Sequence, residues 1–300
     1  MRGTVREGRL RRRVGGGARF AISRAFTIHV KRSIRAPFMP DRKKRQPRVI
    51  LAIAGYDPSS GAGVTADIKT IAAHGCYGVT CITALTVQST RGVMRVAPLA
   101  GSLIAETLEQ LFEDLEISAV KIGMLGSAEA ARAVAHFLDR HNVRHVVLDP
   151  IIKSSSGASL ISEDGLQVLK EQLLHKASVI TPNIEEAAML TGLSVANPRE
   201  MEAAAARLHH LGPRNVIITG GHLDSPRDLI SRAGQPCTLL KGRKIPGNST
   251  HGTGCVFSTS LACELARGRD LLRAARAAKR FVTSALQSAP VIGKGIGPVL

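Results

Sequence analysis

The sequence predicts one α/β domain built on a mostly parallel sheet with helices on both faces. Three observations support this fold class. Short apolar runs alternate with amphipathic stretches of helical spacing, which is the pattern of βαβ units. No linker-like segment interrupts residues 49–300. Hydrophobic residues make up 44% of the 300-residue chain and charged residues 21%, as in ordinary globular proteins.

The expected elements follow this alternation along the chain. Residues 48–54 are an apolar run that stops at Gly55 and predict a buried first strand, and residues 64–74 carry apolar side chains at helical spacing. Further strands are expected over 79–85, 93–97, 119–122, 145–148, 178–180 and 215–219. Further helices are expected over 102–115, 127–141, 164–174, 184–191, 199–211, 254–267 and 270–288, and a hairpin or irregular excursion over 229–245. Ligands bind beyond the carboxyl ends of the strands in such sheets, so the loops there are expected to hold a site.

Residues 1–47 are predicted to be a separate basic leader. The chain has a formal net charge of +18, and residues 1–48 hold 16 of its 41 Lys and Arg but only the acids Glu7 and Asp41. The other 252 residues are nearly balanced, with 25 basic and 21 acidic side chains. The leader could be an overcalled translation start with Met39 as the true beginning, an organelle-targeting segment, or a nucleic-acid-binding arm. In each case we expect it to be poorly ordered.

Composition and missing motifs exclude several classes of protein. No apolar run reaches the roughly 18–20 residues of a membrane-spanning helix. The five Cys include no C-x-x-C pair, which argues against a disulfide framework or a zinc site and favours a reducing, cytoplasmic location. The P-loop motif G-x-x-x-x-G-K-[ST] is absent. Aromatic residues are 3% of the chain and Trp is missing, so a base-stacking surface for nucleic acid is not expected.

The first candidate site is the small-residue loop 55–63, which follows the first strand. Gly61–Ala66 matches the dinucleotide fingerprint G-x-G-x-x-G/A, but no acid lies between Asp67 and Glu106 to bind a ribose. The loop can instead be a tight turn that needs glycine, or a pocket for a small flat ligand with Asp57 as a charged acceptor.

The second candidate is the segment His251–Cys255, which leads into an apolar helix. Its glycines expose backbone N–H groups at a helix N-terminus, where anions are favoured. Cys255 lies in the first helical turn, where the pKa of a thiol can fall well below 8.5, so its thiolate could accept a proton from a substrate hydroxyl. The alternative is a glycine-rich turn with a buried structural cysteine.

Two further candidates contain carboxylates at strand ends. Asn183 and Glu186 are three residues apart and could hold the waters of Mg²⁺ near phosphates, or could form a helix capping box. Asp149 ends a strand and precedes the segment 153–157, which contains three serines. Asp149 could be a second acid near the metal and the serines could donate to phosphate, or the segment could be a simple turn.

The order and spacing of these motifs resemble the hydroxymethylpyrimidine/phosphomethylpyrimidine kinases of thiamine biosynthesis, members of the ribokinase-like superfamily. The resemblance spans about residues 49–299 and does not cover the leader. It is carried by the segments 54–63, 66–70, 82–90, 121–125, 149–150, 181–187, 220–223, 250–255 and 293–299. The segments Thr250–Cys255 and Gly293–Pro298 are quite specific. The resemblance implies a three-layer sandwich over residues 48–300.

The resemblance also implies a reaction and the residues that carry it. The enzyme would phosphorylate 4-amino-5-hydroxymethyl-2-methylpyrimidine and then its monophosphate, with ATP as co-substrate and Mg²⁺ as cofactor. Gly252, Thr253 and Gly254 would form the anion hole, and Cys255 would be the base. Substrate binding would involve Gly55, Asp57, Ala62, Gln88 and Met124. Asn183, Glu186, Thr219, Ser155 and Lys153 would bind the nucleotide, and Asp149 and Glu186 would hold Mg²⁺ through water. A homodimer is implied because relatives are commonly dimers.

Three positions depart from the family pattern. The family usually has Ser or Thr where Tyr56 stands, Lys where Ser155 stands and often Lys where Thr219 stands. Two cations near ATP are therefore missing, although Lys153 is two residues from Ser155 and points to the same side of a strand-like stretch. The alternatives are a pyridoxal kinase of the same superfamily and a non-catalytic pyrimidine-binding regulatory protein on this fold.

Overall fold

The computed structural model describes residues 46–300 except 155, 222 and 224. The basic leader expected over residues 1–47 lies almost wholly outside the described residues. Residues 46–300 form one compact unit.

The described residues contain a nine-stranded sheet with the order β3-β2-β1-β4-β5-β6-β7-β8-β9. Strands β1, β2 and β4–β7 pair in parallel, while β3 at one edge and β8 and β9 at the other pair antiparallel. The strands are β1 (Val49–Tyr56), β2 (Tyr77–Ser89), β3 (Gly92–Pro98), β4 (Ile117–Ile122), β5 (Val146–Leu148), β6 (Val179–Ile180), β7 (Asn215–Ile218), β8 (Arg227–Arg232) and β9 (Thr238–Lys241). The mostly parallel sheet predicted from the alternation is confirmed.

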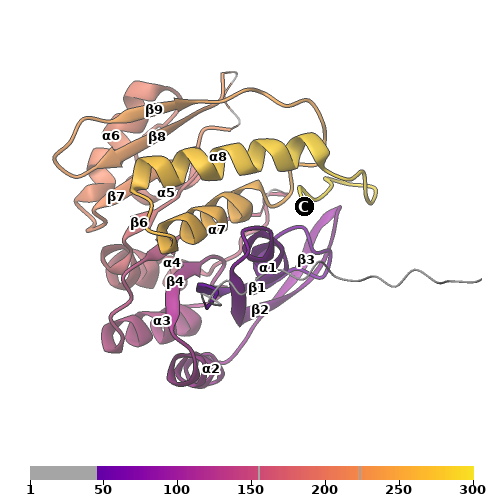
Figure 1. Ribbon diagram of the computed structural model, residues 1–300, viewed down its shortest axis with the longest axis vertical. Coiled ribbons are helices and arrows are strands. Elements are labelled where there is room, and N and C mark those ends of the chain that lie inside the picture. The colour runs from indigo at the N-terminus through magenta and orange to yellow at the C-terminus, as the bar shows by residue number, and fades with distance from the viewer. Residues whose placement is uncertain (1–45, 155, 222, 224) are drawn as a thin grey trace, which may run out of the picture. The chain divides into compact units, whose positions relative to one another are not determined.

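Helices cover both faces of this sheet, which makes three layers (Figure 1). The helices are α1 (Gly63–Ala73), α2 (Gly101–Asp114), α3 (Ala128–Arg140), α4 (Glu163–Val168), α5 (Ile184–Thr191), α6 (Pro198–His209), α7 (Thr253–Ala266) and α8 (Leu271–Ser288). Helices α1, α7 and α8 pack on one face, where alternate strand residues such as Ile50, Val147 and Ile217 are buried. Helices α2–α6 pack on the other, over residues such as Leu51 and Val146. Strands β1 and β4–β7 therefore bury side chains on both faces, as central parallel strands do.

Three expected elements differ from those observed. Strand β2 runs to Ser89, beyond the expected end at Leu85, because its second half leaves β1 and pairs with β3. The helix expected over 164–174 is divided into α4, a π-helical turn over Leu169–Leu173 and a 3₁₀ turn over Leu174–Lys176. The excursion expected over 229–245 contains a regular hairpin, β8–β9.

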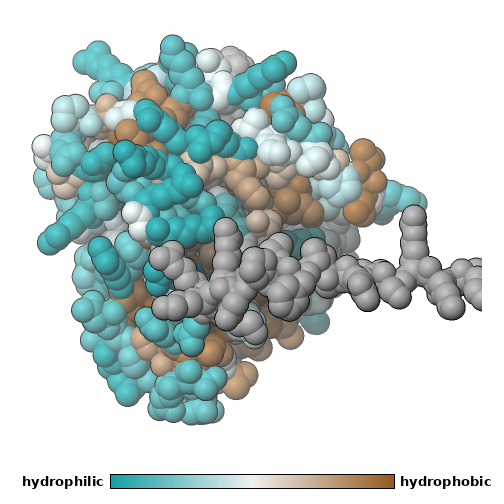
Figure 2. All heavy atoms as spheres, viewed as in Figure 1, coloured by the Kyte–Doolittle hydropathy of each residue, from teal (hydrophilic) through white to brown (hydrophobic). Residues whose placement is uncertain are grey.

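The first half of α8 presents a polar outer surface. Figure 2 shows hydrophilic side chains there, and the helix exposes Arg273, Arg276 and Arg280 while burying Ala274, Ala275 and Ala278. Among the described residues, none of the helices combines the length and apolar character that a membrane span requires.

Candidate functional site

The predicted site residues lie along one edge of the sheet, where the parallel strands end. Gln88 is in β2, Gly55 is the last residue but one of β1, Met124 follows β4 and Asp149 follows β5. Asn183 follows β6 and Thr219 follows β7, and these two residues form an isolated bridge. The structure thus spreads the expected substrate residues and nucleotide residues over neighbouring strand ends, with the N-terminus of α7 near the middle.

The loop between β1 and α1 is organised by the buried carboxylate of Asp57. Its Oδ1 accepts hydrogen bonds from Ser59 N at 2.8 Å and Ser59 Oγ at 2.7 Å, and its Oδ2 accepts from Ala62 N at 2.9 Å. His251 Nε2 lies 2.8 Å from the same Oδ2. Although burial opposes ionisation, the hydrogen bonds from His251 and Ser59 lower the pKa of Asp57. The carboxylate therefore fixes the loop in addition to any contact with a ligand.

The expected pocket residues are neighbours in space. A Cβ atom on Gly55 would lie 2.8 Å from Met124 Sδ, so a side chain at position 55 would displace this methionine. Met124 is held in turn by Thr83, whose hydroxyl donates to its carbonyl oxygen at 2.6 Å. Gln88 is half-buried and its amide lies 3.1 Å from His251 Nε2, which joins it to the Asp57 loop. Tyr56 is 37% exposed at the end of β1, on the rim of this group.

The segment 252–254 begins α7 and approaches the Asp57 loop closely. Gly252 has φ +85°, and a Cβ there would lie 1.9 Å from the carbonyl oxygen of Gly61. No side chain caps this helix, and no acid lies in its first turn. Of the backbone N–H groups at this start, that of Thr253 donates to the carbonyl oxygen of Thr250 at 3.3 Å, and the anion hole expected over Gly252–Gly254 stays a prediction.

The environment of Cys255 contradicts the expectation that its thiol pKa falls. Cys255 is 4% exposed. Burial, together with the nearby carboxylates of Asp67 and Asp149, raises the pKa of Cys255 to about 12, against the opposing effects of the Lys121 ammonium and a hydrogen bond from the Gly63 backbone. The helix N-terminus, which would lower the pKa of the thiol, therefore has a smaller effect on it than burial away from water.

A buried ion pair that sequence reasoning missed lies behind the cysteine. Lys121 in β4 and Asp67 in α1 are both fully buried, and Lys121 Nζ donates to both carboxylate oxygens of Asp67 at 3.0 Å. Thr259 in α7 also donates to Asp67, at 2.6 Å. Burial alone would lower the pKa of Lys121, but Asp67, Cys255 and Asp149 together raise it. A lysine within an otherwise apolar strand was the signal available in the sequence.

Asn183 and Glu186 form the capping box that the sequence offered as one of two alternatives. Glu186 N donates to Asn183 Oδ1 at 2.9 Å, and Asn183 N donates to Glu186 Oε2 at 2.9 Å. Burial, and then the charge of Asp149, raise the pKa of Glu186 to about 8. Asp149 accepts from Ser258 at 2.9 Å, and its own pKa is also raised by burial. The charge of Asp149, which lies near Gly254 at the start of α7, thus disfavours ionisation of Glu186.

Few positively charged side chains stand at the positions expected to bind the nucleotide. Lys153 is exposed and pairs with Ser159 through an isolated bridge. Thr219 donates its backbone N–H to Pro182 at 2.9 Å. Ser155 lies outside the described residues.

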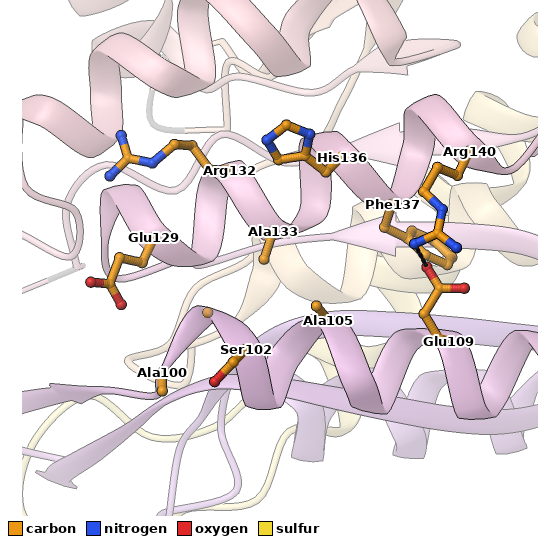
Figure 3. A pocket seen from close by; sticks show the side chains of 11 residues that line it. Ala100, Ser102, Ala105, Glu109, Glu129, Arg132, Ala133, His136, Phe137 and Arg140 are labelled. Carbon is orange, nitrogen blue, oxygen red and sulfur yellow. Dashed lines mark ion pairs between the residues drawn. The ribbon is translucent and has the colours of Figure 1, made fainter.

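A separate hollow of about 540 Å³ lies between α2 and α3 (Figure 3). Ala105 and Ala133 line it, and the ion pair between Glu109 and Arg140, 3.2 Å long, lies at one end. None of the predicted site residues lines this hollow, so it is not part of the site at the strand ends.

Comparison with known proteins places the chain in a family. The family described as phosphomethylpyrimidine kinase matches residues 57–300. The chain belongs to the phosphomethylpyrimidine kinase family. This family membership confirms the resemblance carried by the motifs and the ribokinase-like fold expected from it.

Individual relatives of this family agree. The chain is 39% identical over 248 residues to the hydroxymethylpyrimidine/phosphomethylpyrimidine kinase of Aquifex aeolicus, covering 82% of this chain and 97% of that protein. It is 42% identical over 253 residues to the thiamine biosynthesis bifunctional protein ThiED of Geobacter sulfurreducens, covering 83% of this chain but 51% of that longer protein. A solved structure of Staphylococcus aureus pyridoxal kinase with ADP superposes with a TM-score of 0.78 and 31% identity, covering 85% of this chain and 93% of that one.

Proposed function

We propose that this enzyme transfers the terminal phosphoryl group of ATP to 4-amino-5-hydroxymethyl-2-methylpyrimidine and then to the resulting monophosphate. The observation that carries the proposal is the order of groups along the sheet edge. The pyrimidine-pocket residues lie at the ends of β1, β2 and β4, and the nucleotide residues lie at the ends of β6 and β7. The uncapped start of α7 lies close to both groups, through Gly61 on one side and Asp149 on the other. The two substrates would therefore meet at Gly252–Cys255.

In this proposal the chain supplies position and charge for an in-line transfer. The backbone N–H groups of Gly252, Thr253 and Gly254 stabilise charge on the phosphoryl group during transfer. Cys255 Sγ takes the proton of the acceptor hydroxyl, which requires its thiolate form. The ammonium of Lys121 is the nearby group that favours this thiolate. The raised pKa of Cys255 means that the thiolate is scarce before the substrates bind.

Asp149 and Glu186 suit a magnesium ion held through water. Both carboxylates are buried, and the charge of Asp149 raises the pKa of Glu186, so a cation near them would favour the ionised form of Glu186. Among the described residues, no group of three His, Cys, Asp or Glu side chains could hold a metal directly. Mg²⁺ commonly uses one or two carboxylates with waters and substrate phosphates. When bound, it would neutralise charge on the phosphates of ATP.

A phosphoryl-transfer assay on purified protein tests this function. Hydroxymethylpyrimidine, its monophosphate and pyridoxal are offered in parallel with Mg²⁺–ATP, and turnover of both pyrimidines is the expected result. Cys255→Ala should lower turnover by about 100-fold or more while pyrimidine binding stays, because only the proton acceptor is lost. Cys237→Ala, at a half-buried cysteine directly before β9, is the matched control. Unchanged turnover in the Cys255→Ala variant would remove Cys255 from the reaction.

Pyridoxal phosphorylation is the second candidate. The similarity to pyridoxal kinase from S. aureus favours it, since that match covers most of both chains. Turnover of pyridoxal alone in the same assay would support this alternative. Pyrimidine binding without ATP consumption would instead support a regulatory protein that has lost catalysis, with Ser155 and Thr219 as the sites of the lost cations.

We further propose a homodimer in a reducing cytoplasm. Strand β3 is an edge of the sheet, and the β2–β3 ribbon exposes Leu85 (45%), Val87 (44%) and Met94 (86%), an apolar group that a second copy could cover. All five cysteines are free thiols. Analytical ultracentrifugation tests the dimer, and a monomer at micromolar concentration would refute it.

A further inference from the structure

The turn between α1 and β2 places a half-buried cysteine, Cys76, against helix α7. Gly75 has φ +61°, which lets the chain reverse after α1, and the Cys76 N–H donates back into the last turn of α1 at 3.1 Å. Helix α7 packs on this turn through two residues. Ser260 Oγ lies 2.9 Å from His74 Nε2, and the guanidinium of Arg267 donates to the His74 carbonyl oxygen. The turn is therefore fixed against α7.

A second cysteine, Cys263, lies on the same face of α7, between Ser260 and Arg267. Its thiol is hydrogen-bonded to the thiol of Cys76. Cys263 is fully buried, whereas Cys76 is half-buried, and both pack in the apolar cluster beneath α7 and α8. A small reagent from solvent therefore reaches this pair of sulfur atoms from the Cys76 side.

The groups around the pair favour ionisation of Cys76 over ionisation of Cys263. The hydrogen bond from Cys263 lowers the pKa of Cys76 to about 7, with a further contribution from the Arg267 guanidinium, while burial and the charge of Glu264 oppose the shift. Glu264 is itself paired with Arg267 at 3.0 Å and with Arg269. The hydrogen bond to Cys76 and burial raise the pKa of Cys263. Cys76 is thus the thiolate of the pair and Cys263 the thiol.

We propose that Cys76 and Cys263 form a redox-sensitive pair that a hydroperoxide converts to a disulfide. The Cys76 thiolate attacks one oxygen of the hydroperoxide, so that an S–O bond forms and the O–O bond breaks. The leaving oxygen takes up the proton that Cys76 released and departs as water or an alcohol. The Cys263 sulfur then attacks the sulfenic acid on Cys76, so that the S–S bond forms, the S–O bond breaks and water leaves with the Cys263 proton. Two thiols are oxidised and one hydroperoxide is reduced, independently of the proposed phosphoryl transfer.

The other cysteines provide the contrast that the test needs. Burial raises the pKa of both Cys81 and Cys255 to about 12, so these thiols stay protonated and react slowly. Cys237 is half-buried and directly precedes strand β9, as Cys76 directly precedes β2. Cys237→Ala is therefore the matched control for variants of the pair.

Mild oxidation of the full chain followed by peptide mass spectrometry tests the pair. The protein is exposed to an equimolar amount of hydrogen peroxide, alkylated with N-ethylmaleimide in urea and digested without reductant. We expect a link between Cys76 and Cys263 within one chain, and the number of alkylated cysteines should fall by two from the original five. Dithiothreitol should restore all five. The Cys237→Ala control should form the same link.

Two variants of the pair test the order of the steps. Cys263→Ser keeps a small buried side chain but removes the second thiol, so the sulfenic acid on Cys76 should persist and its labelling by dimedone should exceed that of wild type at least about tenfold. Cys76→Ser, at the half-buried position, should leave Cys263 unoxidised. Equal dimedone labelling of wild type and Cys263→Ser overturns the proposal. A link between two copies of the chain, a link to another cysteine, or no link in wild type overturns it as well.

Discussion

The chemistry of single residues here depends more on burial than on sequence position. Cys255 stands at a helix N-terminus, where a lowered thiol pKa was expected, yet burial and two carboxylates raise it. The sequence allowed Glu186 to be a helix cap or a metal residue. Its Oε2 caps helix α5, and burial together with the charge of Asp149 raises its pKa. Neither effect can be read from spacing, because both depend on segments far apart in the chain.

Glu186 makes stability depend on pH in a specific direction. Its pKa is about 8 in the folded protein against 4.5 for the ordinary group. Between these values the folded state keeps a proton that the unfolded state releases, so the free energy of unfolding should fall as pH rises, by at most about 1.4 kcal/mol per pH unit. Urea denaturation at pH 5, 6.5 and 8 measures this slope.

Glu186→Gln is the matched variant for that slope. Glutamine also completes a capping box, so α5 keeps its start. Between pH 5 and pH 8 the free energy of unfolding of the variant should fall less steeply than that of wild type. Near pH 8 the variant should be the more stable protein. If the free energy of unfolding changed with pH equally in both proteins, Glu186 would have an ordinary pKa and the prediction would be wrong.

At the scale of elements, the glycines at the two ends of α7 share a positive φ but differ in how closely other atoms approach them. Gly252 before the helix and Gly268 after it have nearly the same φ, +85° and +84°. A Cβ on Gly252 would lie 1.9 Å from Gly61 O, whereas a Cβ on Gly268 meets nothing within 4 Å. Positive φ is required at both, but close approach to another loop only at Gly252.

Substituting alanine at each of these two glycines should therefore distinguish the cost of backbone strain from the effect of displacing the Asp57 loop. Gly268→Ala should cost about 1 kcal/mol of stability and leave turnover near wild type. Gly252→Ala must move the Asp57 loop from the start of α7 and should lower turnover at least tenfold beyond that loss of stability. Thermal unfolding and steady-state kinetics on both variants check this, and equal kinetics would contradict a role for close loop contact.

The order and type of most elements were predictable because helical and strand periodicities are local. The end of β2 was not, because its extension depends on pairing with β3 across a turn and not on its own composition. The expected site residues could be assigned to strand ends from the sequence alone, and their roles stay predictions. The contacts of Lys121 with Asp67 and of His251 with Asp57, however, join residues 54 and 194 positions apart.

At the scale of the molecule, the Lys121–Asp67 pair joins the sheet to one helical layer. Asp67 lies in α1, Lys121 in β4 and Thr259 in α7, and the three side chains form one buried network. Lys121→Met should lower the free energy of unfolding by about 3–5 kcal/mol, because it leaves a buried carboxylate unpaired. Adding Asp67→Asn should recover part of that loss. Urea denaturation of the single and double variants measures both, and additive losses would show that the two side chains do not interact.

The hydrogen bonds that hold the C-terminal segment against the site have a consequence for how the protein is made. Thr90 accepts from Gly295, 205 positions further on, and binds Ile296, while His251 is fixed by Gly297 and Val299. The N-terminal part of a chain leaves the ribosome first, so the strands of the sheet can pair before residues 295–299 emerge. Each new chain would then pass through a stage in which the sheet is folded while Thr90 and His251 still lack their contacts with this segment.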